Sequence, residues 1–412
     1  MRPVWLLRFS ALSWNYARFL EYRLLPKLSR DLCCLRKKSK TVLLAEVTTE
    51  HGIVVRMVGD STEEFNGYYE KFMSMLSSMD RPSEAGDYFQ KVAAYNLDGG
   101  KRIRGALVGT ALKAFGNDEC KPEIIRSAHL TGWCIEMLHA GFLILDDIMD
   151  DSPKRRGKPS WFSHQRAAGR GLIAINDGLH LVLCAKSLLH QIFSSYPEQL
   201  SAYSRIIKIF DMVAYNTCWG QNLDTNFAQS PNPDSSIDLT VYSKANFDSI
   251  TRWKTGFYTF YLPVACGMAL AGVEDEQVYA DAEKILLKLG QYFQAQDDYL
   301  DCFGEVEETG KIGTDISDGK CSWLIVECLS RASPKQIEVV KKFYGRKGDK
   351  AASAIRELYE ELGLPAVFRN YEMKMRAEIN QDIENWRSID NHPEGSCTLF
   401  SRLVEMLFLR SR

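Results

Sequence analysis

Apolar residues recur every three or four positions along most of the chain after about residue 61, which is the spacing of one face of an α-helix. The pattern predicts helices over residues 65–79, 85–94, 106–115, 124–147, 171–196, 200–222, 242–272, 275–302, 323–332, 334–344, 351–363, 365–387 and 398–409. Turn-rich breaks separate some of them, at 152–160, 229–238, 345–350 and 390–396. We therefore expect an all-α bundle of about a dozen helices, in one domain over residues 61–412.

One stretch within this pattern, residues 255–273, carries no charged residue and approaches the length of a membrane span. It contains Pro263 and several Thr and Gly residues, and Lys254 and Glu274 bound it closely. We expect a buried core helix that is broken or kinked at Pro263, with a membrane span as the alternative.

Residues 1–40 differ from the rest of the chain. Their Lys and Arg residues are opposed only by Glu21 and Asp31, and the first twenty residues mix Arg with apolar side chains and contain no acid. This composition is typical of an organellar transit peptide, so we expect mitochondrial targeting. A basic tail or a surface amphipathic helix is the alternative, with the protein then cytoplasmic.

The net charge bears on nucleic-acid binding, and the cysteine content bears on the redox compartment. The net charge is −2, which gives no global signal for nucleic acid. The 11 cysteines include no Cys-x-x-Cys pair, which favours buried thiols in a reducing compartment over disulfides or a zinc site.

Two acidic motifs carry the candidate chemistry. Asp146, Asp147 and Asp150 form an Asp-Asp-x-x-Asp pattern at the end of one long apolar run, and residues 297–301 repeat that pattern at the end of another. On a helix, residues four apart share a face, so Asp146 and Asp150 point the same way. Like charges one turn apart repel each other, and hard oxygen ligands without nearby His or Cys suit Mg²⁺ shared with substrate phosphates.

Basic segments accompany both motifs. Gly99–Gly105 contains Lys101 and Arg104 at the start of a predicted helix, which suits a phosphate but also fits a solvated helix start. Arg155 and Arg156 follow the first motif, while Lys254 lies at the mouth of an apolar helix. The segments that follow the second motif contribute Lys311 and Lys320. Together these patterns predict a ligand with two diphosphates and a hydrocarbon remainder.

In these motifs the sequence resembles the trans-isoprenyl diphosphate synthases, closest to their farnesyl diphosphate synthase branch. The segments that carry the resemblance are 99–105, 146–161, 254–263, 293–304 and 309–323, and they occur in the family's order and spacing. The resemblance implies the isoprenoid synthase helical bundle around a central cavity, usually as a homodimer. It implies head-to-tail condensation of isopentenyl diphosphate with dimethylallyl and then geranyl diphosphate, giving farnesyl diphosphate.

The resemblance also implies residue roles. Asp146, Asp150 and Asp297 would hold Mg²⁺, usually three ions. Asp147, Asp298 and Asp301 would support them, and Asp301 is also a candidate ligand. The allylic diphosphate would be contacted by Arg155, Lys254, Thr255, Gln294, Lys311 and Lys320. The diphosphate of isopentenyl diphosphate would be bound by Lys101, Arg104, His139 and Arg156.

Two departures from the family concern product and substrate. His139 stands where the family usually has Gln, and a protonated imidazole would favour a diphosphate more strongly. Animal-type farnesyl synthases usually carry two aromatic residues just before the first acid motif, where this chain has Gly141 and Phe142. Gly141 would admit a longer product or bulkier substrate, so geranyl or geranylgeranyl diphosphate remains an alternative product.

Two rival functions share parts of this pattern. A terpene cyclase has the same bundle, but its second motif usually differs from Asp-Asp-x-x-Asp and it needs no second diphosphate site. A silent subunit of a heteromeric synthase normally loses acids from one motif, whereas this chain keeps all six.

Overall fold

The computed structural model describes residues 62–116, 120–229, 236–304, 313–389 and 392–409. The predicted targeting segment 1–40 and Lys311 lie outside this range. The described residues belong to one compact unit and are almost entirely helical, which confirms the all-α prediction. The α-helices are α3 (Tyr69–Ser77), α4 (Ser83–Leu97), α5 (Ile103–Phe115), α6 (Pro122–Met149), α7 (Trp161–Ala167), α8 (Ile173–Phe193), α9 (Leu200–Phe227), α10 (Lys244–Ile250), α11 (Leu262–Leu270), α12 (Glu276–Phe303), α14 (Asp315–Asp318), α15 (Trp323–Leu329), α16 (Pro334–Phe343), α17 (Asp349–Glu361), α18 (Leu364–Arg387) and α19 (Glu394–Leu409).

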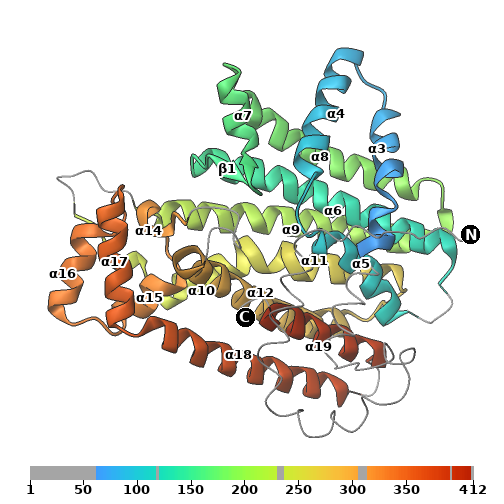
Figure 1. Cartoon of the computed structure of the whole chain (residues 1–412). Helices are drawn as coiled ribbons and strands as arrows, with labels where there is room; N and C mark the ends of the chain where they lie inside the picture. The colour runs from blue at the N-terminus through green and yellow to red at the C-terminus, as the bar shows by residue number, and fades with distance from the viewer. Residues whose placement is uncertain (1–61, 117–119, 230–235, 305–312, 390–391, 410–412) are drawn as a thin grey trace, which may run out of the picture. The chain divides into compact units, whose positions relative to one another are not determined.

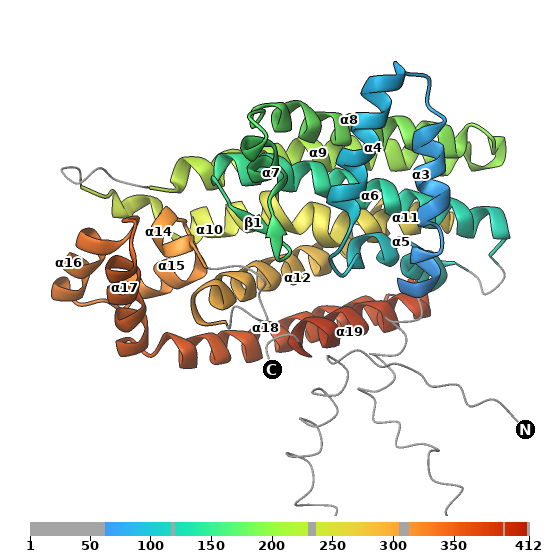
Figure 2. The same ribbon diagram turned by 45° about the horizontal axis from the view of Figure 1, so that its top comes forward.

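The centre of the bundle is α6, which packs against α5 and α8, while α9, α11 and α12 complete the inner layer (Figures 1 and 2). Trp133 of α6 is fully buried and stacks on Phe65, with ring centroids 4.6 Å apart. Helix α6 is long and apolar enough to cross a membrane, but 83% of its most apolar window is buried inside the protein. Burial on all sides identifies it as a core helix.

The uncharged stretch 255–273 is buried in this core, as predicted, but its helix is not a simple kinked α-helix. After α10 the backbone forms a π-helix, η4 (Thr251–Tyr261), and returns to α-helix at α11. Pro263 lies in the first turn of α11, where its missing N–H is tolerated. The change of helix type therefore falls just before Pro263, and the wider π-turn includes Lys254 and Thr255.

The predicted loop 152–160 contains a small hairpin that the helical pattern did not indicate. Strands β1 (Lys154–Arg155) and β2 (Lys158–Pro159) pair antiparallel, with Arg155 opposite Lys158. Arg156 and Gly157 form the turn with φ of 54° and 75°, the left-handed values that a two-residue type I′ hairpin requires. Two short 3₁₀ turns, η2 (Pro197–Gln199) and η3 (Leu239–Val241), complete the connections.

Candidate active site

The first acid motif ends α6, next to the hairpin and toward the end of the bundle where α14 lies (Figures 1 and 2). Asp146 accepts from Lys254 Nζ at 3.0 Å and from Gln221 Nε2 at 3.1 Å. Asp147 turns to another face and accepts from Arg155, at 3.0 Å from Nε and 2.5 Å from Nη2. Arg155 Nη2 also lies 3.3 Å from Asp146 Oδ2, so this guanidinium bridges the first two carboxylates of the motif.

A buried carboxylate of α9, Asp224, joins the basic residues of this cluster. Its Oδ2 lies 2.7 Å from Lys254 Nζ and 2.8 Å from Lys320 Nζ. Lys320 also donates to Asp150 Oδ1 at 2.8 Å. Acids and cations therefore alternate from Asp146 through Lys254, Asp224 and Lys320 to Asp150. This chain of contacts brings together α6, α9, η4 and the segment before α15.

The alternation determines the protonation of the cluster. Burial opposes ionisation of Asp146, but Lys254, Arg155 and Lys320 hold its pKa below the ordinary value. Burial raises the pKa of Asp147 to about 6 despite the nearby Arg155. Burial and the charge of Asp146 also raise the pKa of Asp150. The two acids of this cluster whose pKa is lowered, Asp146 and Asp224, are those that each contact two cations.

The second acid motif lies near the C-terminal end of α12. Asp298 is buried and accepts from Gln294 Nε2 at 2.8 Å and from the backbone N–H of Trp323 at 2.7 Å. Burial raises its pKa to about 7. Asp301 accepts from the N–H of Asp315 at 3.0 Å, while Asp297 is half-buried. Two of the three carboxylates thus fix the start of α14 and α15 on the end of α12.

The π-helix η4 places Lys254 and Thr255 between the two motifs. Gly220 of α9 lies so close to η4 that a Cβ there would stand 2.0 Å from Lys254 N, and Gly256 packs closely on Gly290 of α12. Thr255 Oγ1 then donates to Gln294 Oε1 at 2.6 Å. Close approach of three backbones is thus what brings Lys254 to Asp146 and Thr255 to the second motif.

A second group of basic residues surrounds His139, which lies two turns before the first motif. Arg104 donates to Thr259 Oγ1 at 3.0 Å, and its guanidinium lies 4.9 Å from the centre of the Tyr258 ring. Tyr258 also stacks on His139, with centroids 5.5 Å apart. Glu136 accepts from the N–H of Gly105 at 2.8 Å and so ties the start of α5 to α6.

His139 is neutral near pH 7 in the ligand-free site. Burial lowers its pKa to about 4, and the positive charge of Arg104 acts in the same direction. Glu136 Oε2 lies 3.7 Å from its Nδ1 and opposes this shift. The neutral ring of the ligand-free site can donate a hydrogen bond to a diphosphate.

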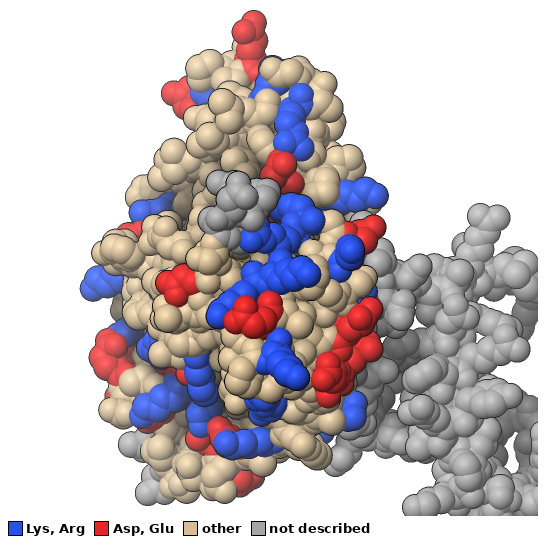
Figure 3. Space-filling view, turned by 90° about the vertical axis from the view of Figure 1, so that its left-hand side faces the viewer, with Lys and Arg blue, Asp and Glu red and all other residues tan. Residues whose placement is uncertain are grey.

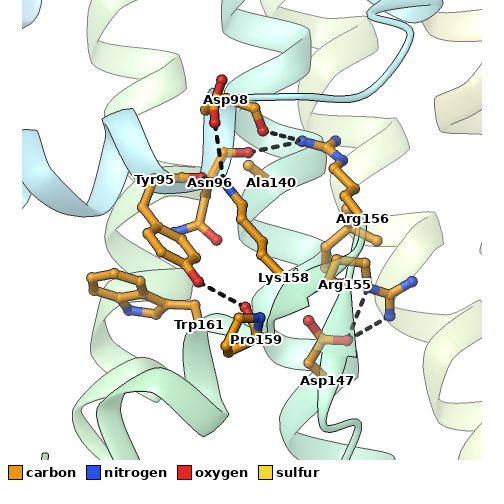
Figure 4. A pocket seen from close by; sticks show the side chains of 11 residues that line it. Tyr95, Asn96, Asp98, Ala140, Asp147, Arg155, Arg156, Lys158, Pro159 and Trp161 are labelled. Atoms are coloured by element: carbon orange, nitrogen blue, oxygen red, sulfur yellow. Dashed lines mark hydrogen bonds and ion pairs between the residues drawn. The ribbon is translucent and has the colours of Figure 1, made fainter. Parts of the chain in front are cut away.

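Arg156 extends from the hairpin turn to the loop that precedes α5. Its Nη1 donates to the carbonyls of Asn96 and Asp98 at 3.1 and 3.3 Å (Figure 4). It also donates to the carbonyl of Gly99 at 3.3 Å. The guanidinium lies against Gly100, where a Cβ would come within 3.0 Å and φ is +77°. Glycine is favoured there on both counts. The exposed Lys101 follows directly in the same loop.

The two candidate chain-length residues have different surroundings. Phe142 packs edge-on against Tyr258, at 6.0 Å between centroids, and so borders the site. Gly141 faces α8, where an added Cβ would stand 2.7 Å from Gly178 O and 2.8 Å from Val182 Cγ2. A larger residue at 141 would therefore press α6 away from α8, which the sequence-based expectation of a wider tail pocket did not include.

Several residues of the site were not predicted from the sequence. Gln221 and Asp224 lie three apart on one face of α9, and a polar pair on an otherwise buried face was the available signal. Tyr258, Thr259 and Glu136 were missed because each looks like ordinary helical sequence until the helices are packed. Figure 3 views the end of the bundle nearest α14 and α16, where Lys and Arg side chains gather with acidic side chains among them.

Among the described residues, no group of three or more His, Cys, Asp and Glu side chains is close enough to hold a metal by itself. Asp146 and Asp150 nevertheless offer hard oxygen donors one turn apart, and ammonium groups already lie against both. This donor set fits a cation whose remaining ligands come from phosphate oxygens and water.

Comparison with known proteins agrees with this geometry. Residues 86–362 match the polyprenyl synthetase family. Farnesyl pyrophosphate synthase of Gallus gallus is 40% identical over 328 residues, covering 78% of this chain and 86% of that protein. Farnesyl pyrophosphate synthase 1, mitochondrial, of Arabidopsis thaliana is 36% identical and covers 86% and 94%. The solved T. brucei farnesyl diphosphate synthase complexed with risedronate superposes with a TM-score of 0.73, at 30% identity over 85% and 98% of the chains. The chain belongs to the polyprenyl synthetase family.

Proposed function

We propose that the chain is a Mg²⁺-dependent prenyltransferase that condenses isopentenyl diphosphate with dimethylallyl and then geranyl diphosphate to give farnesyl diphosphate. The observation that carries this proposal is the pair of separate basic clusters. One alternates with the carboxylates of α6 and α9, and the other surrounds Arg104 and His139. Two anionic head groups, one of them bound to metal, would account for both basic clusters. The farnesyl pyrophosphate synthases at about 40% identity agree with this product.

Magnesium would be held by Asp146, Asp150, Asp297 and Asp301, together with oxygens of the allylic diphosphate. When bound, three such ions would polarise that diphosphate and stabilise the charge that develops as it leaves. Asp147 and Asp298 would support these ligands. Asp147 is held by Arg155, and Asp298 accepts from the backbone N–H of Trp323.

The basic residues of the first cluster then complete the allylic site. Lys254 and Lys320 would turn from carboxylates to diphosphate oxygens, with Arg155, Thr255 and Gln294 beside them; Lys311 is proposed from the sequence alone. Fixed positive charges stabilise the departing anion without reorganisation at the moment of reaction. Tyr258, Phe142 and the apolar helices would enclose the allylic cation and keep water from it.

The second cluster would bind isopentenyl diphosphate through Lys101, Arg104, Arg156 and neutral His139. The carbon–oxygen bond of the allylic diphosphate breaks, and the double bond of isopentenyl diphosphate attacks the allylic carbon to form a carbon–carbon bond. The condensed cation then loses a proton to the released diphosphate, which restores a double bond. A terpene cyclase would leave this second cluster without a role, so it is the weaker function. Phe142 would set the product length at fifteen carbons, with Gly141 acting through the α6–α8 contact.

We further propose a homodimer. Apolar side chains with 47–53% exposure follow one face of α8 at Ile175, Leu179 and Leu183. The neighbouring helix α9 exposes Tyr215 (64%) and Trp219 (53%). Exposed apolar stripes of this kind are typical of subunit interfaces. Replacing Leu179 with Lys should shift the molar mass measured by light scattering toward the monomer, whereas an unchanged mass would place the interface elsewhere.

Targeting to mitochondria is proposed from the basic segment 1–40, and the Arabidopsis thaliana relative named as mitochondrial supports it. A fluorescent protein fused after residue 40 should co-localise with mitochondria, whereas diffuse fluorescence would favour a cytoplasmic enzyme.

Product analysis tests the proposed reaction directly. The full chain is incubated with Mg²⁺, isopentenyl diphosphate and, separately, dimethylallyl, geranyl or farnesyl diphosphate, and products are identified by mass. We expect farnesyl diphosphate from the first two starters. A ten- or twenty-carbon end product would change the chain length alone, while a cyclic hydrocarbon or no product would refute prenyl transfer.

A further inference from the structure

Helix α4 ends in a cap made of three basic side chains. The carbonyl of Ala94 accepts from the backbone N–H of Asp98. The next three carbonyls accept from side chains: Tyr95 O from Lys158 Nζ at 2.8 Å, Asn96 O from Arg156 Nη1 at 3.1 Å, and Leu97 O from Arg102 Nη2 at 3.2 Å. The last carbonyls of a helix have no partner within it and form the negative end of its dipole, so cations stabilise them.

Lys158 makes further contacts beyond the carbonyl of Tyr95. Its ammonium also lies 3.3 Å from Asp98 Oδ2 and 4.3 Å from the centre of the Tyr95 ring. Tyr95 in turn packs on Trp161, at 5.0 Å between centroids. Figure 4 shows the Lys158 side chain between Tyr95 and Arg155 in the pocket formed by the hairpin and α4. One side chain thus contacts both the end of α4 and the aromatic wall beside it.

The hairpin connects this cap to the metal-binding side of α6. Arg155 and Lys158 are cross-strand partners and therefore lie on one face of the hairpin. Arg155 extends to Asp147 of α6, while Lys158 extends to Tyr95 of α4. The loop that follows α4 carries Gly100 and Lys101, so its position relative to α6 depends on this bridge.

We infer that Lys158 is a positioning residue for the second diphosphate site, an inference that rests on the proposed function. Arg156 would contact the diphosphate of isopentenyl diphosphate. An Nη1 hydrogen that bonds to this ligand can no longer bond to the carbonyls of Asn96, Asp98 and Gly99. Lys158 keeps the end of α4 capped through Tyr95 O while this happens. It thereby holds the loop with Lys101 in place and does not itself touch substrate.

The test compares the two substrates in steady-state kinetics of the full chain. Lys158→Gln should raise KM for isopentenyl diphosphate about three- to ten-fold, the scale of one charged contact at a helix end. kcat and KM for geranyl diphosphate should stay within about two-fold, because Arg155 retains its bonds to Asp147. Lys158→Arg should restore KM, since a guanidinium can reach the same carbonyl.

Lys154→Gln is the matched control, because Lys154 is an exposed lysine of the same hairpin on the opposite strand. It should leave both KM values unchanged. Should Lys158→Gln fail to fold, Asp98→Asn removes only the 3.3 Å ion pair and should raise KM for isopentenyl diphosphate about two-fold.

Three outcomes would overturn the inference: an unchanged KM for isopentenyl diphosphate, an equal rise of both KM values, or an equal effect of Lys154→Gln. Absence of turnover by the unaltered chain would instead refute the proposed function. Normal turnover with any of these three outcomes would refute only the role of Lys158.

Discussion

The two basic clusters of the site differ in what holds their cations. Near the acid motifs, carboxylates hold Lys254 and Lys320, so each positive charge is already balanced. Near the α4–α5 loop, backbone carbonyls hold Arg156, and a hydroxyl and an aromatic ring hold Arg104. Neither arginine forms an ion pair with a described residue, and the buried carboxylate of Glu136 acts on both at longer range. We therefore expect the first cluster to take a diphosphate only together with metal, and the second to attract a diphosphate by itself.

Loss of a carboxylate that we propose as a metal ligand should have the largest effect. Asp146→Ala should lower kcat about a thousand-fold or more, since it removes a ligand and its charge from the leaving-group side. The fold should persist, because Lys254 still donates to Asp224 and Arg155 still donates to Asp147. Rapid-quench turnover and thermal unfolding measure the two effects, and near-normal turnover would remove Asp146 from the metal site. Asp297→Ala should behave in the same way.

Removal of metal should separate the two clusters directly. With EDTA, binding of geranyl diphosphate should weaken about a hundred-fold, whereas binding of isopentenyl diphosphate should change by less than about three-fold. Titration calorimetry at constant ionic strength measures both. Equal weakening of both ligands would mean that the second cluster also depends on metal and would end the distinction between them.

Asp224→Asn tests whether Asp224 positions the two lysines of the first cluster. Lys254 and Lys320 both lie within 2.8 Å of the same carboxylate oxygen, so a neutral amide would leave two like charges side by side. We expect kcat to fall about ten- to a hundred-fold with little change in KM for isopentenyl diphosphate. Asn222→Asp, on the same helix, serves as a control for altered charge. An unaffected kcat would show that Asp224 does not position the two lysines.

The contrast between the clusters also marks what the sequence could predict. Carboxylates four apart on one helix are a local pattern, so the sequence alone is enough to propose Asp146 and Asp150 as metal ligands. Asp224 is 30 residues from Lys254 and 96 from Lys320, and only helix packing brings the three together. The hairpin was missed because its strands have two residues each, too few for an alternating pattern.

Gly141 shows the limit of inference from neighbours in sequence. Gly141 and Phe142 are adjacent, but successive residues on a helix point about 100° apart. Phe142 meets Tyr258, whereas Gly141 meets the backbone of Gly178 on α8.

A pair of substitutions tests this difference. Phe142→Ala should extend part of the product to twenty carbons, because it removes a ring that borders the site. Gly141→Phe should destabilise the fold by about 3 kcal/mol, since its ring has no space between α6 and α8. Mass analysis of products and chemical denaturation measure the two. A stable Gly141→Phe variant with a shortened product would show instead that residue 141 lines the tail pocket.

At neutral pH the smallest effect should come from His139, where the second cluster meets the core. Its pKa lies near 4 in the folded chain and near 6.5 when unfolded, so between these values only the unfolded chain binds the proton. The stability that neutral His139 contributes is therefore lost as pH falls from about 6.5 toward about 4. His139→Gln, which cannot be protonated, should match the native chain at pH 7.5 and exceed it by at most about 3 kcal/mol near pH 4. Urea unfolding across this range measures the difference, with Glu136, Arg104, Arg156 and Tyr258 unchanged around the site. A difference independent of pH would mean that His139 is solvated, and that the second cluster is wetter than its packing against Tyr258 indicates.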